Sequence, residues 1–109
     1  MPKVVIILKD DSNAEFFFTK EFQLSIVPLE GDEVMAQLSA EGGYVSAVAE
    51  RVTHFLGADI IQVWCRTSLR SLCRLYLGNM DWQPNDKDAF ISRPKVKKLI
   101  EKILSELSE

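Results

Sequence analysis

Histidine and cysteine are the residues that most often carry metal-binding or nucleophilic chemistry, and this sequence offers few of them. His54 is the only histidine, and Cys65 and Cys73 are the only cysteines. A zinc site would need all three side chains and a carboxylate, yet the cysteines stand eight positions apart instead of forming a Cys-x-x-Cys pair. Both cysteines lie in apolar stretches, where a thiol behaves as a small buried hydrophobe. The sequence therefore predicts no metal site, no cofactor and no catalytic cysteine.

Two other groupings that resemble catalytic constellations are better explained as turns. The Gly-Gly pair at 42–43 lacks the spacing and the following lysine of a phosphate-binding loop. The acidic pairs Asp10 with Asp11 and Asp86 with Asp88 could flank a substrate bond, but aspartate in turn-rich segments usually binds its own backbone. The sequence therefore favours a non-enzymatic protein, with an enzyme whose site is hidden from sequence reasoning as the open alternative.

Basic side chains of the C-terminal half are candidate contacts for an anion or a nucleic acid. Arg66, Arg70 and Arg74 are four positions apart, so a helix through them would align three guanidinium groups, which suit bidentate contacts to phosphates. Lys95 and Lys98 extend the positive charge to the last helix. Residues 61–109 hold nine Lys/Arg against six Asp/Glu, whereas residues 1–60 hold four against ten. A solvated face without a partner is the alternative interpretation of this asymmetry.

Apolar residues near the C-terminus are candidate interface anchors. Met80 and Trp82 stand in a polar stretch, and Leu99 and Ile103 belong to an apolar stripe on the last helix. A homodimer through that helix would bury the stripe. The alternative is that the stripe covers the open end of the chain's own sheet.

These side chains must be positioned by one domain, because 109 residues with 47% hydrophobic content make a single core over residues 1–109. Apolar runs separated by turn residues predict strands at 4–8, 15–19, 33–38 and 60–65. They favour a small antiparallel, barrel-like sheet over residues about 3–66. We therefore predict an α+β fold in which C-terminal helices follow this sheet.

The stretch 45–56 is ambiguous. Val45, Ala49 and Val52 fall at helical spacing, although glycine turns on either side suit a strand in a hairpin. The alternative fold therefore has residues 45–56 helical against a mixed sheet.

Two helices are expected in the C-terminal part. The first follows Thr67 or Ser68 as its N-cap and ends at Gly78. The second begins where Ser92 can cap and Pro94 stands in the first turn, a position where its missing N–H costs nothing.

The segment Pro28-Leu29-Glu30-Gly31-Asp32-Glu33-Val34, the later strands and the Trp82-Gln83-Pro84 element together form a pattern. Over residues 3 to 85 it resembles small uncharacterised bacterial proteins with SH3-like β-barrels. The resemblance implies a barrel fold and no particular activity.

The predicted function is a small non-catalytic protein–protein interaction or structural module, whose partner is an unknown protein or a second copy. The alternative is nucleic-acid binding through the C-terminal Arg/Lys face. The longest apolar run, at 4–8, is far below the ~20 residues that span a bilayer, and the N-terminus does not read as a signal peptide. We therefore expect a cytoplasmic protein with no membrane contact.

Overall fold

The computed structural model describes residues 3–12, 15–40, 42–78 and 81–107. Five strands come first: β1 (Lys3–Asp10), β2 (Phe17–Gln23), β3 (Glu33–Ser39), β4 (Gly42–Phe55) and β5 (Ile60–Thr67). They are followed by α1 (Leu69–Gly78), the short strand β6 (Gln83–Pro84), α2 (Lys87–Ser92) and α3 (Pro94–Leu107). The predicted α+β class, with helices after the sheet, is confirmed.

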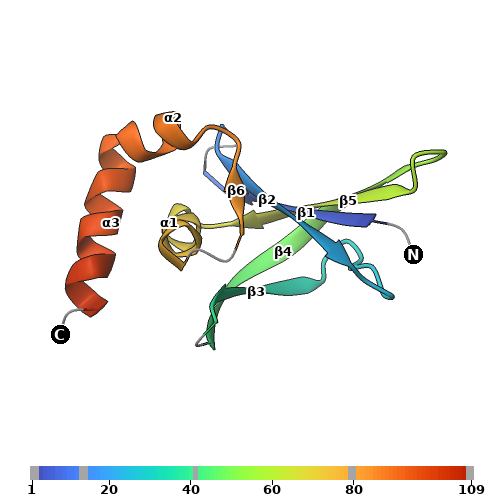
Figure 1. Cartoon of the computed structure of the whole chain (residues 1–109), viewed down its shortest axis with the longest axis horizontal. Helices are drawn as coiled ribbons and strands as arrows, with labels where there is room; N and C mark the ends of the chain where they lie inside the picture. Colours follow the sequence, from blue (N-terminus) through green and yellow to red (C-terminus); the bar gives the residue numbers. More distant parts are fainter. Residues whose placement is uncertain (1–2, 13–14, 41, 79–80, 108–109) are drawn as a thin grey trace.

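The strands form one sheet in the order β3-β4-β5-β1-β2-β6. The sheet curls into a half-barrel, in which β1, β2 and β5 form an upper layer and β3 and β4 cross beneath it (Figure 1). The predicted barrel-like sheet is confirmed, but it is mixed instead of wholly antiparallel, because β1 and β5 run parallel. The β3–β4 hairpin separates β2 from β5 in the chain, so β5 reaches β1 by a crossover that local spacing does not reveal.

Side chains of the sheet alternate between an inner face, which holds the core, and an outer face. Inner residues of the two central strands are apolar and buried: Val4, Ile6 and Leu8 on β1, and Ile61, Val63 and Cys65 on β5. Phe18 on β2 and Ala36 on β3 continue this inner face on the two flanks of the half-barrel. The period-two pattern of the sequence thus reports which side of each strand meets the core.

Strand β4 shows that the alternative prediction of a helix over residues 45–56 is wrong. A β-bulge between Ala49 and Arg51 inserts one extra residue, Glu50. Before the bulge the inner residues have odd numbers, as Val45 and Ala49 do; after it they have even numbers, as Val52 does. The bulge therefore gives positions 45, 49 and 52 the i, i+4, i+7 spacing of a helix.

Helices α1 and α3 close one end of the half-barrel (Figure 1). Ser68 caps α1, because its hydroxyl accepts a hydrogen bond from the Ser71 N–H at 3.1 Å. Gly78, the last residue of α1, packs so closely on β3 that an added Cβ would lie 1.8 Å from the Leu38 carbonyl oxygen. Val96 of α3 is fully buried in the core cluster that the helices share with the sheet.

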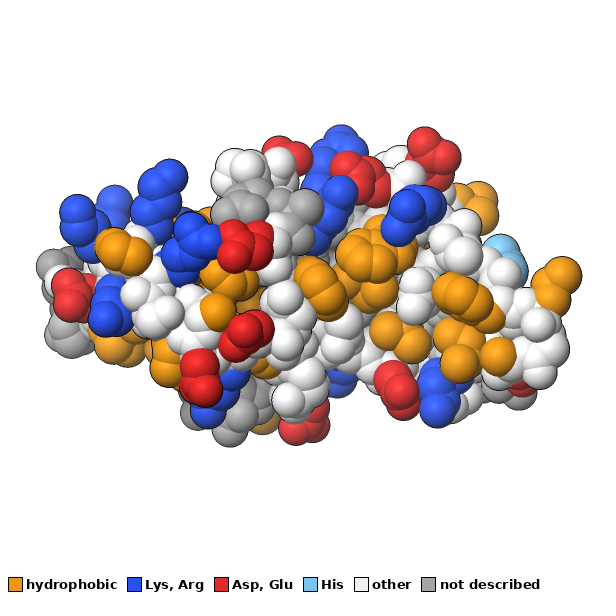
Figure 2. Space-filling model, turned by 90° about the horizontal axis from the view of Figure 1, so that it is seen from above, with side chains coloured by type: hydrophobic (Ala, Val, Ile, Leu, Met, Phe, Trp, Pro, Cys, Tyr) orange, Lys and Arg blue, Asp and Glu red, His pale blue; other side chains and the backbone are white. Residues whose placement is uncertain are grey.

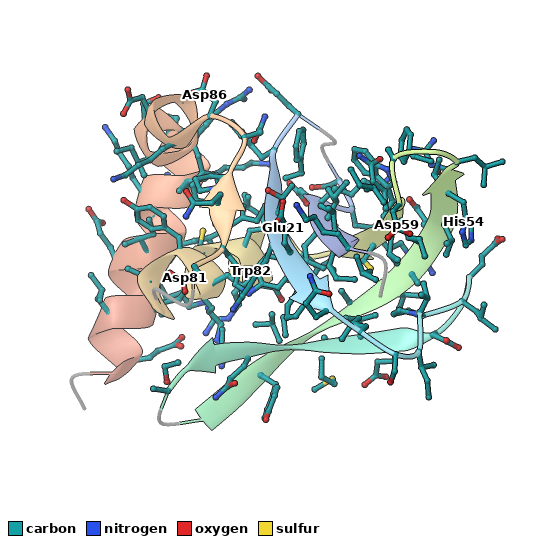
Figure 3. The ribbon with its side chains drawn as sticks, turned by 45° about the vertical axis from the view of Figure 1, so that its right-hand side comes forward. Glu21, His54, Asp59, Asp81, Trp82 and Asp86 are labelled. Atoms are coloured by element: carbon teal, nitrogen blue, oxygen red, sulfur yellow. The ribbon has the colours of Figure 1, made fainter. Side chains whose placement is uncertain are left out.

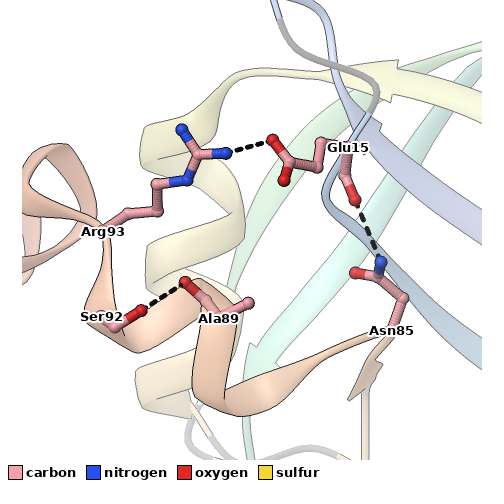
Figure 4. A network of polar contacts seen from close by, with 5 residues as sticks. All are labelled: Glu15, Asn85, Ala89, Ser92 and Arg93. Atoms are coloured by element: carbon pink, nitrogen blue, oxygen red, sulfur yellow. Dashed lines mark hydrogen bonds and ion pairs between the residues drawn. The ribbon is translucent and has the colours of Figure 1, made fainter.

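Helix α2 was not predicted from the sequence. Asp86 is its N-cap, since the carboxylate accepts from the Ala89 N–H at 3.1 Å. Ser92 ends α2, and its hydroxyl donates to the Ala89 carbonyl at 3.0 Å (Figure 4). The predicted capping of the last helix by Ser92 is therefore wrong, whereas Pro94 in its first turn is confirmed.

A polar network fastens this helical segment to the start of β2 (Figure 4). The Asn85 side chain donates to the Glu15 carbonyl at 3.0 Å and accepts from the Phe17 N–H at 3.1 Å. The Arg93 guanidinium pairs with the Glu15 carboxylate and lies over the Phe16 ring. The network holds β6 and α2 against β2, and so fixes one wall of the half-barrel.

Candidate functional site

The three arginines proposed for one helical ridge do not share a helix. Arg66 lies in β5, where its guanidinium is 4.0 Å from the Glu50 carboxylate, whereas Arg70 and Arg74 lie in α1. Arg70 pairs with Glu106 of α3 and so joins the two helices. The ridge expected from the spacing is divided between two elements, because the helix begins only at Leu69, after Arg66.

The lysines of α3 are exposed, as a binding face requires. Lys95 and Lys98 both point to solvent, and Figure 2 shows Lys and Arg side chains gathered at the α3 end of the molecule. Contact of these lysines with a nucleic acid stays a prediction.

The candidate interface anchors pack largely within the chain. Trp82 is 8% exposed, Ile103 is buried, and Leu99 packs against the core, while Met80 lies outside the described residues. The stripe on α3 thus lies against α1, whereas the alternative interpretation had placed it over the open end of the sheet, and among its described side chains Leu104 is exposed. A homodimer through α3 also stays a prediction.

The chemistry-bearing residues do not converge. His54 lies near the end of β4, across the sheet from Asp81 and Asp86 (Figure 3). Cys65 and Cys73 are fully buried, and burial raises the pKa of each thiol to about 11. In the described part of the chain no group of three metal-ligating side chains comes together.

The acidic turn before β2 behaves as the turn interpretation expects. Asp10 is buried, and one of its oxygens accepts from the Ser12 N–H at 3.1 Å and from the Ser12 hydroxyl at 3.0 Å. The Asp10 carboxylate thus stabilises the turn that follows β1 through these two hydrogen bonds.

The half-barrel is open along one side, between β2 and β3. Strand β3 is the last strand of the sheet on this side, so within the described residues only β4 pairs with it. Across the ladder Ala49 donates to the Asp32 carbonyl at 2.9 Å and accepts from the Gly31 N–H at 2.8 Å, so hydrogen-bonded pairs begin at this position, where Gly31 and Asp32 together oppose one residue. Since such pairs alternate along an antiparallel ladder, the backbone groups of Glu33, Met35 and Gln37 point away from β4. These groups form the free edge of β3.

An apolar hollow of about 170 Å³, here called the seam groove, lies beside this edge. Its lining comes from β1, β2, the β2–β3 loop, β3 and the segment before β6: Ile6, Phe22, Leu24, Pro28, Val34, Met35, Ala36 and Trp82. The Trp82 indole packs on the Phe22 ring with 6.0 Å between centroids. The groove therefore has a rigid aromatic wall on one side and a strand edge on the other.

Exposed apolar side chains are frequent near the seam groove. Met35 is 52% exposed at its rim, and Ile26 and Leu29 of the β2–β3 loop are 83% and 68% exposed. Large exposed apolar side chains cost free energy in water, so covering the side chains around this opening would be favourable.

The outer face of the sheet carries a second feature, here called the outer-face cluster: Lys9, Phe17, Glu50, Arg51, Trp64 and Arg66. The Phe17 and Trp64 rings meet edge to face, 5.8 Å apart, and the Arg51 guanidinium lies 5.1 Å over Trp64. Figure 2 shows hydrophobic side chains with basic neighbours in the middle of this side of the molecule.

Glu50, the bulge residue, is the acidic centre of the outer-face cluster. Its carboxylate lies 2.6 Å from the Lys9 ammonium, and that hydrogen bond is the main reason why the pKa of Glu50 is lowered from its ordinary value. The nearby charges of Arg66 and Arg51 act in the same direction. Glu50 is therefore ionised at neutral pH and holds the basic side chains in place.

Comparison with protein-family models, with curated proteins and with solved structures finds no match. The resemblance to SH3-like barrels thus stays a prediction, and function is argued from the surfaces above. Among the helices that the structure describes, none has the length and apolar character to cross a membrane.

Sequence reasoning missed both surfaces. The seam groove depends on which strand is last in the sheet, and no local pattern encodes that order. The outer-face cluster joins residues 9, 17, 51 and 64, which are brought together only by strand register. One signal was available in the sequence. Phe17, Val48 and Trp64 are apolar residues at strand positions that face away from the core, where a solvated face usually carries polar residues.

Proposed function

We propose that this chain is a non-catalytic protein-interaction module that binds an extended segment of a partner protein by adding it as a strand to the free edge of β3. The observation that carries the proposal is the position of that edge, directly beside the apolar seam groove. An added strand gains affinity from main-chain hydrogen bonds and specificity from pockets for alternate side chains.

The edge itself supports this function because it lacks the usual protection. Natural edge strands are commonly blocked by lysine, proline or a bulge. Strand β3 (Glu33–Ser39) contains none of these, although Gly31 and Asp32 together oppose Ala49 directly before its first residue. In the part of the chain that the structure describes, its far end is covered where Gly78 of α1 packs on Leu38.

The groove supports a partner segment with alternating apolar residues. Side chains of an added strand would point alternately toward the inner and the outer side of the sheet. On the inner side they would meet Val34, Ala36 and Trp82, which are apolar, and none of the described residues that line this groove is charged. The expected ligand is therefore an extended peptide with apolar residues at every second position.

Selection from phage-displayed short random peptides tests the proposal. We expect enriched sequences with alternating apolar residues, and we expect Met35→Pro to weaken their binding at least about tenfold. Proline removes the Met35 N–H, which points to the free edge, and an edge strand tolerates it. Met35→Thr is the matched control, because it removes the same side chain but keeps the N–H, and it should bind within about threefold of the native protein.

Several results would overturn the proposal. These are an absence of enrichment over bare beads, equal binding of selected peptides to both variants, or a dimer of the native protein that Met35→Pro dissociates. If Met35→Pro does not fold, N-methylation of alternate amides in the selected peptide replaces it. One set of methylated amides should then abolish binding and the other should leave it unchanged.

A further inference from the structure

The outer-face cluster spans four neighbouring strands in register. Phe17 of β2 pairs with Lys9 of β1, and Lys9 pairs with Arg66 of β5. Two positions along β5, on the same face, Trp64 pairs with Arg51 of β4. The register therefore places two aromatic rings and three basic groups on one continuous surface, on the side of the sheet away from the core.

The two aromatic side chains of this surface, Phe17 and Trp64, are partly exposed, and the buried Ile7 lies beneath them. Ile7, on the same face and in register with Trp64, is only 3% exposed, because the larger side chains cover it. Phe17 and Trp64 lie at the wall of a hollow of about 270 Å³ that opens to solvent. Proteins that bind single strands stack unpaired bases on such rings, since every base has a π-face, and a base on Trp64 would take the place that the Arg51 guanidinium holds over that ring.

The charge of the surface complements a phosphate backbone. The cluster holds three basic groups, Lys9, Arg51 and Arg66, and one of its own residues, Glu50, is acidic, while Asp11 lines a neighbouring hollow with Arg66. Two of these cations are arginines, which bind phosphate oxygens with paired N–H groups. This local excess of positive charge occurs in a chain whose formal net charge is −3.

We infer that the outer-face cluster is a binding site for single-stranded nucleic acid, with bases stacked on Trp64 and Phe17 and phosphates held by Lys9, Arg51 and Arg66. This inference goes beyond the proposed function and does not depend on it. A duplex fits less well, because its bases are already stacked on one another and cannot reach the rings.

Fluorescence anisotropy with a labelled oligothymidylate tests the inference on the full chain. With three phosphate contacts, log K should fall with log salt at a slope of about −2, so the affinity should drop about twentyfold between about 50 and 200 mM salt. Arg51→Gln should reduce the slope by about 0.7. Trp64→Ala should weaken binding about tenfold or more with the slope unchanged, because it removes stacking and no charge.

Two further variants sharpen the test. Glu50→Gln should strengthen binding severalfold, because it removes the negative charge that pairs with Lys9 and Arg66. In a Trp82→Phe protein, Trp64 is the only remaining tryptophan, and the oligonucleotide should quench its emission. Lys98→Gln is the control for charge, since it removes one positive group from α3, outside the outer-face cluster, and should leave the affinity unchanged.

The inference is overturned if the oligonucleotide does not bind, or if Trp64→Ala and Arg51→Gln leave its affinity unchanged. It is also overturned if Lys95→Gln and Lys98→Gln abolish binding, which would place the site on α3. If inorganic polyphosphate displaces the labelled oligonucleotide as effectively as unlabelled oligonucleotide does, the surface is a general anion patch and the inference is overturned. Tighter binding of a duplex than of the single strand would contradict a stacking site.

Discussion

The seam groove and the outer-face cluster lie on the same sheet and differ in what they offer a partner. The seam groove offers backbone hydrogen-bonding groups and apolar walls, and its described lining residues carry no charge. The outer-face cluster offers side chains, three of them basic and two aromatic, on strands whose backbone is already paired.

The difference teaches that the position of a strand in the sheet decides the kind of recognition it can support. Strand β3 ends the sheet, so its backbone is free to pair. Strands β1 and β5 are central, so only their outer side chains can contact a ligand. Binding at the seam should depend weakly on salt, and binding at the outer-face cluster strongly.

The largest expected effect concerns the two tryptophans, one at each surface. Trp82 is 8% exposed and packs on Phe22, so Trp82→Ala should lower the free energy of unfolding by about 3–5 kcal/mol. Trp64 is half-buried and contacts Phe17 and Arg51, so Trp64→Ala should cost about 1–2 kcal/mol. Urea denaturation measures both. Equal losses would contradict the view that one tryptophan belongs to the core and the other to a surface.

The next effect concerns the closed end of β3. Gly78→Ala places a methyl group where the Leu38 carbonyl already lies, so α1 must move away from β3, at a cost of about 1–3 kcal/mol. Thermal denaturation measures the loss. A variant as stable as the native protein would show that α1 does not close this end of the edge.

The alternation of the two faces along β5 predicts a difference in thiol reactivity. Cys65 is buried and its pKa is raised to about 11, so it should label only as fast as the protein unfolds at about pH 8. Trp64→Cys places a thiol on the outer face one residue away, and that thiol should label rapidly. If Cys65 in the native protein labels as fast as the introduced thiol, the assignment of inner and outer faces is wrong.

The same raised pKa values predict the alkaline limit of stability. Burial is the first cause of the shift at both Cys65 and Cys73, and the nearby Asp10 charge adds to it at Cys73. Thiols of the unfolded chain ionise near their ordinary pKa of 9.0, below the folded value. The stability that neutral thiols provide is therefore present below about pH 9 and lost as the pH rises toward about 11. Replacing both cysteines with alanine should remove this part of the pH dependence.

The smallest effect concerns Glu50. Its ion pairs are partly exposed, so Glu50→Gln should lower the free energy of unfolding by about 0.5 kcal/mol or less at neutral pH. Because the pKa of Glu50 is lowered in the folded state, this contribution is present above the ordinary value of 4.5 and is lost as the pH falls through the lowered value. Denaturation at neutral and acidic pH, at two salt concentrations, measures it. A loss that persists in acid would contradict an ionic origin.

The sequence predicted those parts of the fold that depend on neighbours in the chain. Alternation at Val34, Ala36 and Leu38 marked the inner face of β3, and the run from Val4 to Leu8 marked a central strand. Ser68 and Gly78 marked the ends of α1. In each case the signal is local, because it depends on which residues face the core or satisfy the ends of a helix.

The parts that were missed depend on strand order and register. The bulge at Glu50 gave β4 a helical spacing, and the parallel pairing of β1 with β5 follows from a crossover. Asp86 caps α2, but this helix has 6 residues and lies in a polar segment, so the sequence pattern did not indicate a helix there. Both candidate surfaces were missed for the same reason as the topology, since a free edge and a four-strand cluster exist only once the strands are ordered.

Amide hydrogen exchange along β3, followed by NMR, tests the central claim most directly. In the free protein we predict fast exchange at Glu33, Met35 and Gln37 and slow exchange at Val34 and Ala36, which pair with β4. Addition of a phage-selected peptide should make the three fast amides slow and leave the other two unchanged. Uniform protection along β3 in the free protein, or three amides that stay fast in the presence of saturating peptide, would contradict a free edge that accepts a partner strand.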